Sequence, residues 1–298
     1  MDGSPDGPDG VAGRFEASRP RLRAVAYRML GSSSEADDAV QEAWLRLSRS
    51  DADGVQNLAG WLTTVVARIC LDMLRARASR REEPLDQQAA DPAAADPGDP
   101  ESEAVLADSV GLAMLIVLDT LAPAERVAFV LHDMFDLPFD QIAGITGRSP
   151  AAARQLASRA RRRVRGTPAV PGDTLSRHKE IVEAFLAASR RGDFGALLAL
   201  LDPDVELRAD AAAVLPGIPR HVTGAEVVAR QARAFHSRAR FAHLALVDGA
   251  AGIVVAPGGR LSVVLTFGVV NGKVATIDVI ADPGRLGRLA LAVLEAEG

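Results

Sequence analysis

The chain has 298 residues, of which 48% are hydrophobic, so it is long enough for two or three domains and is not wholly disordered. Its formal net charge of -5 gives no global sign of nucleic-acid binding, so such a function would have to rest on locally segregated charge. The one cysteine, Cys70, lies in the apolar pattern of an expected helix, which excludes an intramolecular disulfide and argues against a thiol catalyst. We expect a protein of the reducing cytoplasm.

The N-terminal segment is unlike an export signal. Residues 1–12 are acidic and rich in Gly and Pro, where a signal peptide would be basic and then apolar, so we expect a disordered tail there. The apolar run over residues 113–118 is too short to span a bilayer, and we expect no membrane contact.

Three helices are predicted between residues 13 and 81. The first covers residues 15–30, with Gly31 placed to end it in the left-handed conformation. The second is capped by Ser33 or Ser34, has an acidic first turn and buries an apolar stripe of Ala36, Ala39, Val40, Ala43, Trp44 and Leu47. The third runs from Leu58 to about Arg80, and its outer C-terminal half carries five arginines, more than the helix dipole requires: Arg68, Arg75, Arg77, Arg80 and Arg81.

A second helical unit is predicted over residues 104–166, after an acidic, Pro-rich segment at 82–103 that we expect to be a flexible linker. An apolar helix comes first, Pro123 starts another, and residues 135–138 form a turn. A short helix from Phe139, a tight turn over 144–147 and a helix from Ser149 then follow. This order is typical of a helix-turn-helix.

The helix from Ser149 is strongly basic. Ser149 is a natural N-cap, Pro150 suits the first turn, and no carboxylate occurs between Asp140 and Asp173. Its narrow apolar face is expected at Ala152, Leu156, Ala160 and Val164. The second helix of a helix-turn-helix enters the major groove with its N-terminal residues at the base edges. The candidates for base contact are therefore Ser149, Ala151, Arg154, Gln155 and Ser158. Arg159 and Arg162, further along the helix, are candidates for phosphate contact. The alternative is a solvated arginine face.

An α+β domain is predicted over residues 174–298, after a Pro/Gly hinge at 167–173. Three helices come first, over 175–186, 193–201 and 224–235, and four strands follow, over 241–247, 252–256, 260–270 and 273–280. Asn271-Gly272 signals a type I′ hairpin. His243 and Asp278 are candidates to face a cavity, but no acid and base share a spacing that supports catalysis.

Three parts of the helical half resemble parts of the sigma-70 superfamily, and within it the extracytoplasmic-function sigma factors. Residues 34–47, acidic and then containing Trp44, resemble the part of sigma domain two that grips the clamp helices of RNA polymerase. The spacing of Arg68, Asp72 and Arg75 resembles the next part, which helps to melt and read the promoter −10 element. Residues 121–131 followed by 139–143 resemble sigma domain four, which reads the −35 element.

The resemblance implies a set of partners and contact residues. Core RNA polymerase, through its beta-prime clamp helices and beta flap, would be contacted at Glu35, Asp38, Gln41, Glu42 and Trp44. Promoter DNA would be contacted at the −10 element by Arg68, Asp72, Arg75, Arg77 and Arg80, and at the −35 element by the residues named for the Ser149 helix. It implies no cofactor, no metal and no catalytic residue.

The C-terminal domain resembles the SnoaL-like branch of the nuclear-transport-factor-2-like fold, through residues 201–207 and the hairpin. Sigma-J-like sigma factors carry such an extension, which implies a cone-shaped α+β domain with a pocket for a possible small ligand. Two activity-adjusting motifs of that group have altered counterparts here, at Gly258, Gly259 and Arg260 and at Asp282, Pro283, Arg285 and Leu286.

The sequence therefore predicts two all-α domains, over 13–81 and 104–166, and a fused α+β SnoaL-like domain. The predicted function is that of an alternative sigma factor, not an enzyme, whose activity the fused domain modulates. The alternative is a helix-turn-helix regulator that needs no polymerase and has a ligand-sensing or isomerase- or cyclase-like C-terminal domain.

Overall fold

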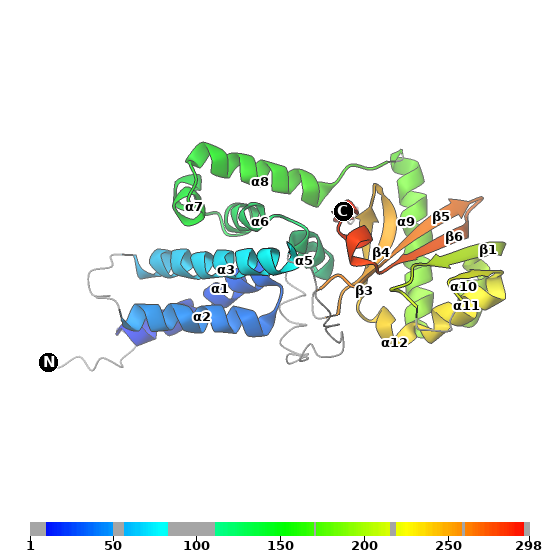
Figure 1. The fold of residues 1–298 in the computed structure, drawn as a ribbon, viewed down its shortest axis with the longest axis horizontal. Helices are drawn as coiled ribbons and strands as arrows, with labels where there is room; N and C mark the ends of the chain where they lie inside the picture. Colours follow the sequence, from blue (N-terminus) through cyan, green and yellow to red (C-terminus); the bar gives the residue numbers. More distant parts are fainter. Residues whose placement is uncertain are drawn as a thin grey trace. The chain divides into compact units, whose positions relative to one another are not determined.

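The computed structural model describes residues 10–49, 57–82, 111–169, 171–214, 219–257 and 260–294 (Figure 1). The chain divides into two compact units, one of residues 1–111 and 121–161 and the other of residues 112–120 and 162–298. The expected linker beyond Glu82, and Gly258 and Gly259 of the first altered motif, lie outside the described residues.

The first unit opens with the three expected helices, α1 (Val11–Leu30), α2 (Ser33–Ser48) and α3 (Leu58–Glu82). Helix α1 begins at Val11, two residues inside the expected tail, because Gly10 takes the extended N-cap conformation. Gly31 is left-handed, with φ 75°, and ends α1 as predicted. The predicted cap of α2 was wrong by one residue or more: Ser32 accepts the Glu35 N–H at 3.4 Å, and Ser33 is buried in the first turn.

The helix-turn-helix consists of α6 (Pro123–Phe129), the π-helical segment η2 (Val130–Met134), α7 (Phe139–Thr146) and α8 (Pro150–Arg165). The expected tight turn over residues 144–147 is shorter than predicted. Helix α7 continues to Thr146 because Ile145 and Thr146 are buried, and only Gly147 is left-handed, with φ 69°. Ser149 caps α8 as predicted, accepting the Ala152 N–H at 3.2 Å.

The second unit contains a seven-stranded sheet in the order β2-β1-β6-β5-β4-β3-β7. Its strands are β1 (Leu201–Ala209), β2 (His221–Thr223), β3 (Ala242–Val247), β4 (Ala250–Val255), β5 (Val263–Val270), β6 (Lys273–Ile280) and β7 (Leu291–Ala292). Only the β1–β6 pair is parallel. Asn271 and Gly272 have φ 51° and 76°, the expected type I′ turn.

The helices of the second unit are α5 (Leu112–Asp119), α9 (Gly172–Arg191), α10 (Phe194–Leu200), α11 (Ala225–Ala234), α12 (His236–Ala239) and α13 (Pro283–Leu286). Side chains from α9, α10 and α11 pack on one face of the sheet, with Phe185 at a ring-centroid distance of 5.2 Å from Phe267 of β5. The predicted α+β class is confirmed. The predicted order of helices before strands was wrong, because β1 and β2 come before α11.

The end of α8 is built into the second unit. Val293, next to β7, donates its N–H to Val164 O at 2.8 Å, and Ala169 donates to Gly249 O at 2.9 Å. Gly166 is left-handed, with φ 63°, and a Cβ there would lie 2.4 Å from the Cβ of Ala292. Only glycine fits this close approach, so the backbone after α8 is packed onto the sheet. Helix α5 contacts β3 and β7 of the same sheet.

Candidate nucleic-acid and polymerase interface

Helix α8 separates an apolar face from a polar one. Its buried side chains are Ala153, Leu156, Ala157, Ala160 and Val164, so the expected apolar face is shifted from Ala152 to Ala153. The seven residues predicted to contact the −35 element are all exposed: Ser149, Ala151, Arg154, Gln155, Ser158, Arg159 and Arg162. This face can present hydrogen-bond donors and positive charge to a groove and its flanking phosphates.

The arginines of α8 differ in their surroundings. Arg159 Nε donates to Glu125 Oε1 at 2.8 Å, and Arg161 Nε donates to Asp133 Oδ1 at 2.5 Å, so both tie α8 to the preceding helical segments. The guanidinium of Arg154 lies 5.6 Å from the centre of the Phe139 ring. In the described part of the chain, Arg162 has no carboxylate within ion-pair distance.

Helix α3 uses several of its arginines within the protein. Arg68 is exposed and donates to Gly144 O of α7 at 3.1 Å. Arg75 and Asp72 are exposed and lie 3.6 Å apart. Arg77 is mostly buried, donates to Leu30 O at 3.0 Å and pairs with Glu35 of α2. Arg80 lies in α3, with its side chain outside the described residues.

The predicted polymerase-binding residues, like the arginines of α3, include both exposed side chains and side chains that contact other parts of the protein. Asp38 and Gln41 are exposed on α2, whereas Glu42 and Trp44 are half-buried, and the Trp44 ring is tilted against that of Phe15 with 4.9 Å between the ring centroids. Glu35 is the partner of Arg77, so the structure joins a predicted polymerase contact to a predicted −10 contact.

One residue of this surface was missed. Leu45 is 38% exposed and follows Asp38 and Gln41 by seven and four residues, which places all three on one face of α2. A leucine outside the apolar stripe of this helix was the available signal.

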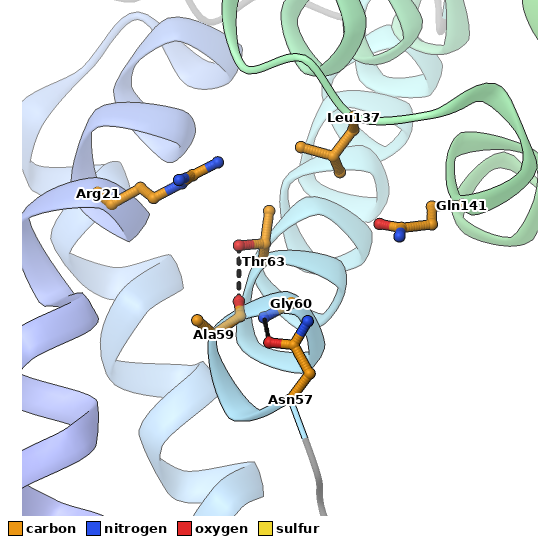
Figure 2. A pocket seen from close by; sticks show the side chains of 7 residues that line it. All are labelled: Arg21, Asn57, Ala59, Gly60, Thr63, Leu137 and Gln141. Atoms are coloured by element: carbon orange, nitrogen blue, oxygen red, sulfur yellow. Dashed lines mark hydrogen bonds between the residues drawn. The ribbon is translucent and has the colours of Figure 1, made fainter.

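A cavity of about 230 Å³ lies within the first unit, between the start of α3, α1 and the segment that leads into α7 (Figure 2). Arg21 points toward it from α1, and Leu137 and Gln141 line the opposite side. The polar groups of α3 at this cavity are engaged locally: Thr63 donates to Ala59 O at 2.8 Å, and Asn57 accepts from Gly60 N–H at 2.9 Å. No carboxylate lines the cavity, so it holds no acid–base pair.

His243 and Asp278 do not face the helix-covered core of the C-terminal domain. Their neighbours Ala242 and Leu244, and Ile277 and Val279, pack toward the helices, and side chains alternate along a strand. Burial and the nearby Arg190 lower the pKa of His243 to about 4, so the imidazole is neutral near pH 7. The helix-covered face is filled by apolar side chains, and a small ligand of this domain stays a prediction.

The second altered motif forms α13. Asp282 caps this turn by accepting the Arg285 N–H at 2.8 Å, Pro283 and Arg285 are exposed, and Leu286 is half-buried. Arg260 of the first motif is exposed.

A residue that the sequence did not single out, Asp210, holds this motif in place. Its Oδ2 accepts the N–H groups of Ala281 at 2.9 Å and Asp282 at 2.8 Å, and its Oδ1 accepts from Ala213 at 3.0 Å. Burial opposes ionisation, but these N–H groups and Arg285 outweigh it and lower the pKa of Asp210.

Two further properties concern only the described residues. No group of three or more His, Cys, Asp or Glu in them is placed to hold a metal ion. None of the helices described is both long and apolar enough to cross a membrane.

Comparisons with known proteins agree with this arrangement. The family model "Sigma-70 region 2" matches residues 14–80, and "Sigma-70, region 4" matches residues 113–164. The ECF RNA polymerase sigma factor SigJ of Mycobacterium tuberculosis is 43% identical over 72% of this chain and 70% of its own length. The probable ECF RNA polymerase sigma factor SigI of the same species is 35% identical over 94% of this chain and 96% of its own length.

Among solved structures, the crystal structure of the Mycobacterium tuberculosis extracytoplasmic function sigma factor SigJ has 36% identity, covers 92% of this chain and 98% of its own, and gives a TM-score of 0.45. The two sequence relatives carry the assignment, confirm the resemblance read from the sequence and do not favour a regulator that works without polymerase. The chain therefore belongs to the extracytoplasmic-function (ECF) RNA polymerase sigma factors, which act as alternative sigma factors in transcription initiation.

Proposed function

We propose that this sigma factor binds core polymerase through the exposed face of α2, at Asp38, Gln41 and Leu45, and reads the −35 element with α8. The clamp helices would receive α2, and the beta flap would receive the α6–α8 segment. The exposure of all seven predicted residues on one face of α8, opposite its buried alanines, carries the proposal. Its work with polymerase places it in the cytoplasm.

The structure represents a resting arrangement on this proposal, because the proposed −10 reader, α3, contacts α7 of the helix-turn-helix that carries the −35 reader. Arg68 of α3 donates to Gly144 O of α7, and Arg126 of α6 is buried with its Nη2 3.5 Å from Arg28 O of α1. Promoter elements near −10 and −35 are about 25 base pairs apart, or about 85 Å at a rise of about 3.4 Å. Helices α3 and α7 therefore separate when both elements are bound.

The C-terminal domain restrains α8 on this proposal. The backbone after α8 is hydrogen-bonded to the sheet beside β7, and Gly166 packs against Ala292 and Leu246. These contacts fix the end of the −35 reader to the fused domain, and a change in the sheet would be transmitted to α8.

Run-off transcription with purified core polymerase tests the sigma function. The wild-type protein should give promoter-specific transcripts, and Gln41→Ala with Leu45→Ala should lower core affinity about tenfold, which corresponds to about 1.4 kcal/mol. Ser48→Ala, exposed on the last turn of the same helix, is the matched control. Equal core binding by all three proteins would contradict the α2 assignment.

A pair of glycine variants tests the restraint. Gly166→Ala and Gly272→Ala both place a side chain at positive φ, but a Cβ at Gly272 has nothing within 4 Å, whereas one at Gly166 meets Ala292. We expect Gly166→Ala to raise run-off transcription severalfold and Gly272→Ala to leave it unchanged. Matching activity in the two variants would remove the support for restraint through this contact.

A further inference from the structure

A basic cluster lies on the second unit, away from the motifs singled out in the sequence. It comprises exposed residues at the end of α9, along α11 and around α12, which are Arg190, Arg191, Arg230, Arg233, His236, Arg238 and Arg240. The three helices belong together, because α12 contacts both α9 and α11. Figure 1 shows α12 beside the C-terminal end of α9.

The charge of this cluster is not compensated. Within the described residues, none of its members has a carboxylate within ion-pair distance, whereas several other surface arginines pair with one, as in Arg23–Asp37, Arg46–Glu42 and Arg208–Glu206. The nearest acids along the chain are Asp193, which accepts the Ala196 N–H as the cap of α10, and Glu226, one turn before Arg230. Six arginines so close together repel one another unless an anion binds.

Neighbouring groups hold several of these guanidinium groups in place. Arg190 donates to Ala239 O and Ala242 O, which anchors the end of α9 to the segment after α12. Arg233 lies 6.0 Å from the centre of the Phe194 ring, and Arg240 lies 4.5 Å from that of Phe241. Arginines fixed in this way lose less conformational freedom when they bind a charged partner.

The composition of the cluster favours a polyanion over a folded protein. Protein interfaces have an apolar centre with charged residues at the rim. Among the described residues, the exposed large apolar side chains are Leu45, Val227 and Val270, and only Val227 lies on these helices, a turn before Arg230. Arginines without an apolar centre are typical of phosphate-backbone contacts.

A short segment tethers the cluster to α8, which favours DNA as the polyanion. Six residues separate the end of α8 from the start of α9, and the 20 residues of α9 span about 30 Å at about 1.5 Å per residue. One turn of B-DNA is about 34–36 Å long, so the length of α9 allows the tethered cluster to reach DNA about one turn from the site that α8 reads. The DNA downstream of the −35 element leads to the −10 element. The DNA upstream of the −35 element is therefore available to the basic cluster.

We propose that the basic cluster binds the phosphate backbone of duplex DNA immediately upstream of the −35 element. The inference rests on the proposed reading of that element by α8. It gives the fused domain a direct, sequence-independent contribution to promoter affinity.

The test compares two charge-neutralised proteins as holoenzymes. Arg191→Gln, Arg230→Gln and Arg238→Gln remove three exposed members of the cluster whose side chains form no hydrogen bond or ion pair with other described residues. The matched control is Arg177→Gln, Arg220→Gln and Arg288→Gln, which removes the same charge from exposed sites elsewhere in the domain. The probes are promoter duplexes selected from random DNA by the wild-type holoenzyme, one ending at the −35 element and one extended about two helical turns upstream.

On the extended duplex we expect the cluster variant to lose about fivefold to tenfold in affinity and to show a salt slope shallower by about 2–3, because each lost phosphate contact removes about 0.9. On the short duplex, and for the control variant on either duplex, affinity should match the wild type. Unchanged binding to the extended duplex would overturn the inference, as would an equal loss on both duplexes.

A loss of core-polymerase binding by the cluster variant would instead identify an acidic protein partner and would also overturn it. Failure of the wild-type holoenzyme to select any promoter would contradict the proposed function itself. Selective binding without dependence on upstream DNA would contradict only the inference.

Discussion

Helices α3 and α8 carry arginines in similar number but use them differently. On α8 the predicted contact residues are exposed together on one face, and Arg162 is free of carboxylates within the described residues. On α3, Arg77 is mostly buried between the end of α1 and the start of α2, and Arg68 donates to the backbone of α7. The comparison teaches that positive charge in a sequence marks a phosphate contact only where no internal acceptor competes for it.

The packing of the two helices explains the difference. Helix α3 contacts α1 and α2 and also α6 and α7, so backbone carbonyls and carboxylates of the first unit surround its arginines. Helix α8 buries mainly alanines, whose short side chains leave the long arginines on the opposite face in solvent.

Replacing Arg77 should have the largest effect on stability. Arg77→Met removes the partner of Glu35 and the donor to Leu30 O, and because Arg77 is only 17% exposed we expect a loss of about 2–3 kcal/mol. The matched change Arg75→Met, in an exposed pair, should cost less than about 0.5 kcal/mol. Urea unfolding followed by tryptophan fluorescence reports on this region, because Trp44 and Trp61 are the only tryptophans. Equal midpoints for the two variants would contradict the stabilising role assigned to Arg77.

The second prediction separates two arginines of α8. Arg159→Gln removes the ion pair with Glu125, whose side chain is 8% exposed, and should destabilise the α6–α8 packing by about 1–2 kcal/mol. Arg162→Gln should leave stability unchanged but lower promoter affinity about threefold, with a salt slope shallower by about 0.9. Hydrogen exchange of α6 amides measures the first effect and fluorescence anisotropy with a promoter duplex the second. Reversed effects would exchange the roles assigned to these residues.

The sequence predicted the elements whose signals are local. Gly31 and Ser149 end and start their helices as expected, and the Asn271-Gly272 turn has the predicted type. Strand β1 was not among the predicted strands, and Pro203 and its acidic neighbours are residue types that are depleted in strands. In the structure, the pairing of β1 with β6 shifts register between Leu201 and Glu206, which accommodates the proline.

The candidate site was harder to predict because its contacts join distant residues. Arg77 and Glu35 are 42 positions apart, and Arg68 and Gly144 are 76 apart, so no local pattern shows that these arginines have internal partners. Which face of the sheet His243 occupies depends on the register of its strand. Apolar residues lie on both faces of this part of the sheet, so the hydrophobic pattern of the sequence does not determine that register. Leu45, by contrast, stood outside the apolar stripe of its own helix.

The smallest expected effect concerns a carboxylate that, unlike the arginines of α8, is held by internal donors. Asp210 has a lowered pKa and a 10% exposed side chain, so its charge contributes stability that is present above its unfolded pKa and lost as pH falls through its folded value, below 3.8. Asp210→Asn keeps an acceptor oxygen but loses the charge, and should cost about 1 kcal/mol near neutral pH. The measurement is the protection from hydrogen exchange of the Ala281 and Asp282 amides, which donate to Asp210.

In the wild-type protein this protection should fall as the pH drops below about 5 toward the lowered pKa of Asp210, because the unfolded chain then binds a proton that the folded carboxylate resists. In Asp210→Asn the protection should be lower near neutral pH and change little over that range. Asp204→Asn, which changes an exposed carboxylate on the strand that ends just before Asp210, should behave as the wild type. If acid still lowers the protection of these amides in Asp210→Asn, other carboxylates cause the loss. In that case α13 would be held by its Asp282 cap alone.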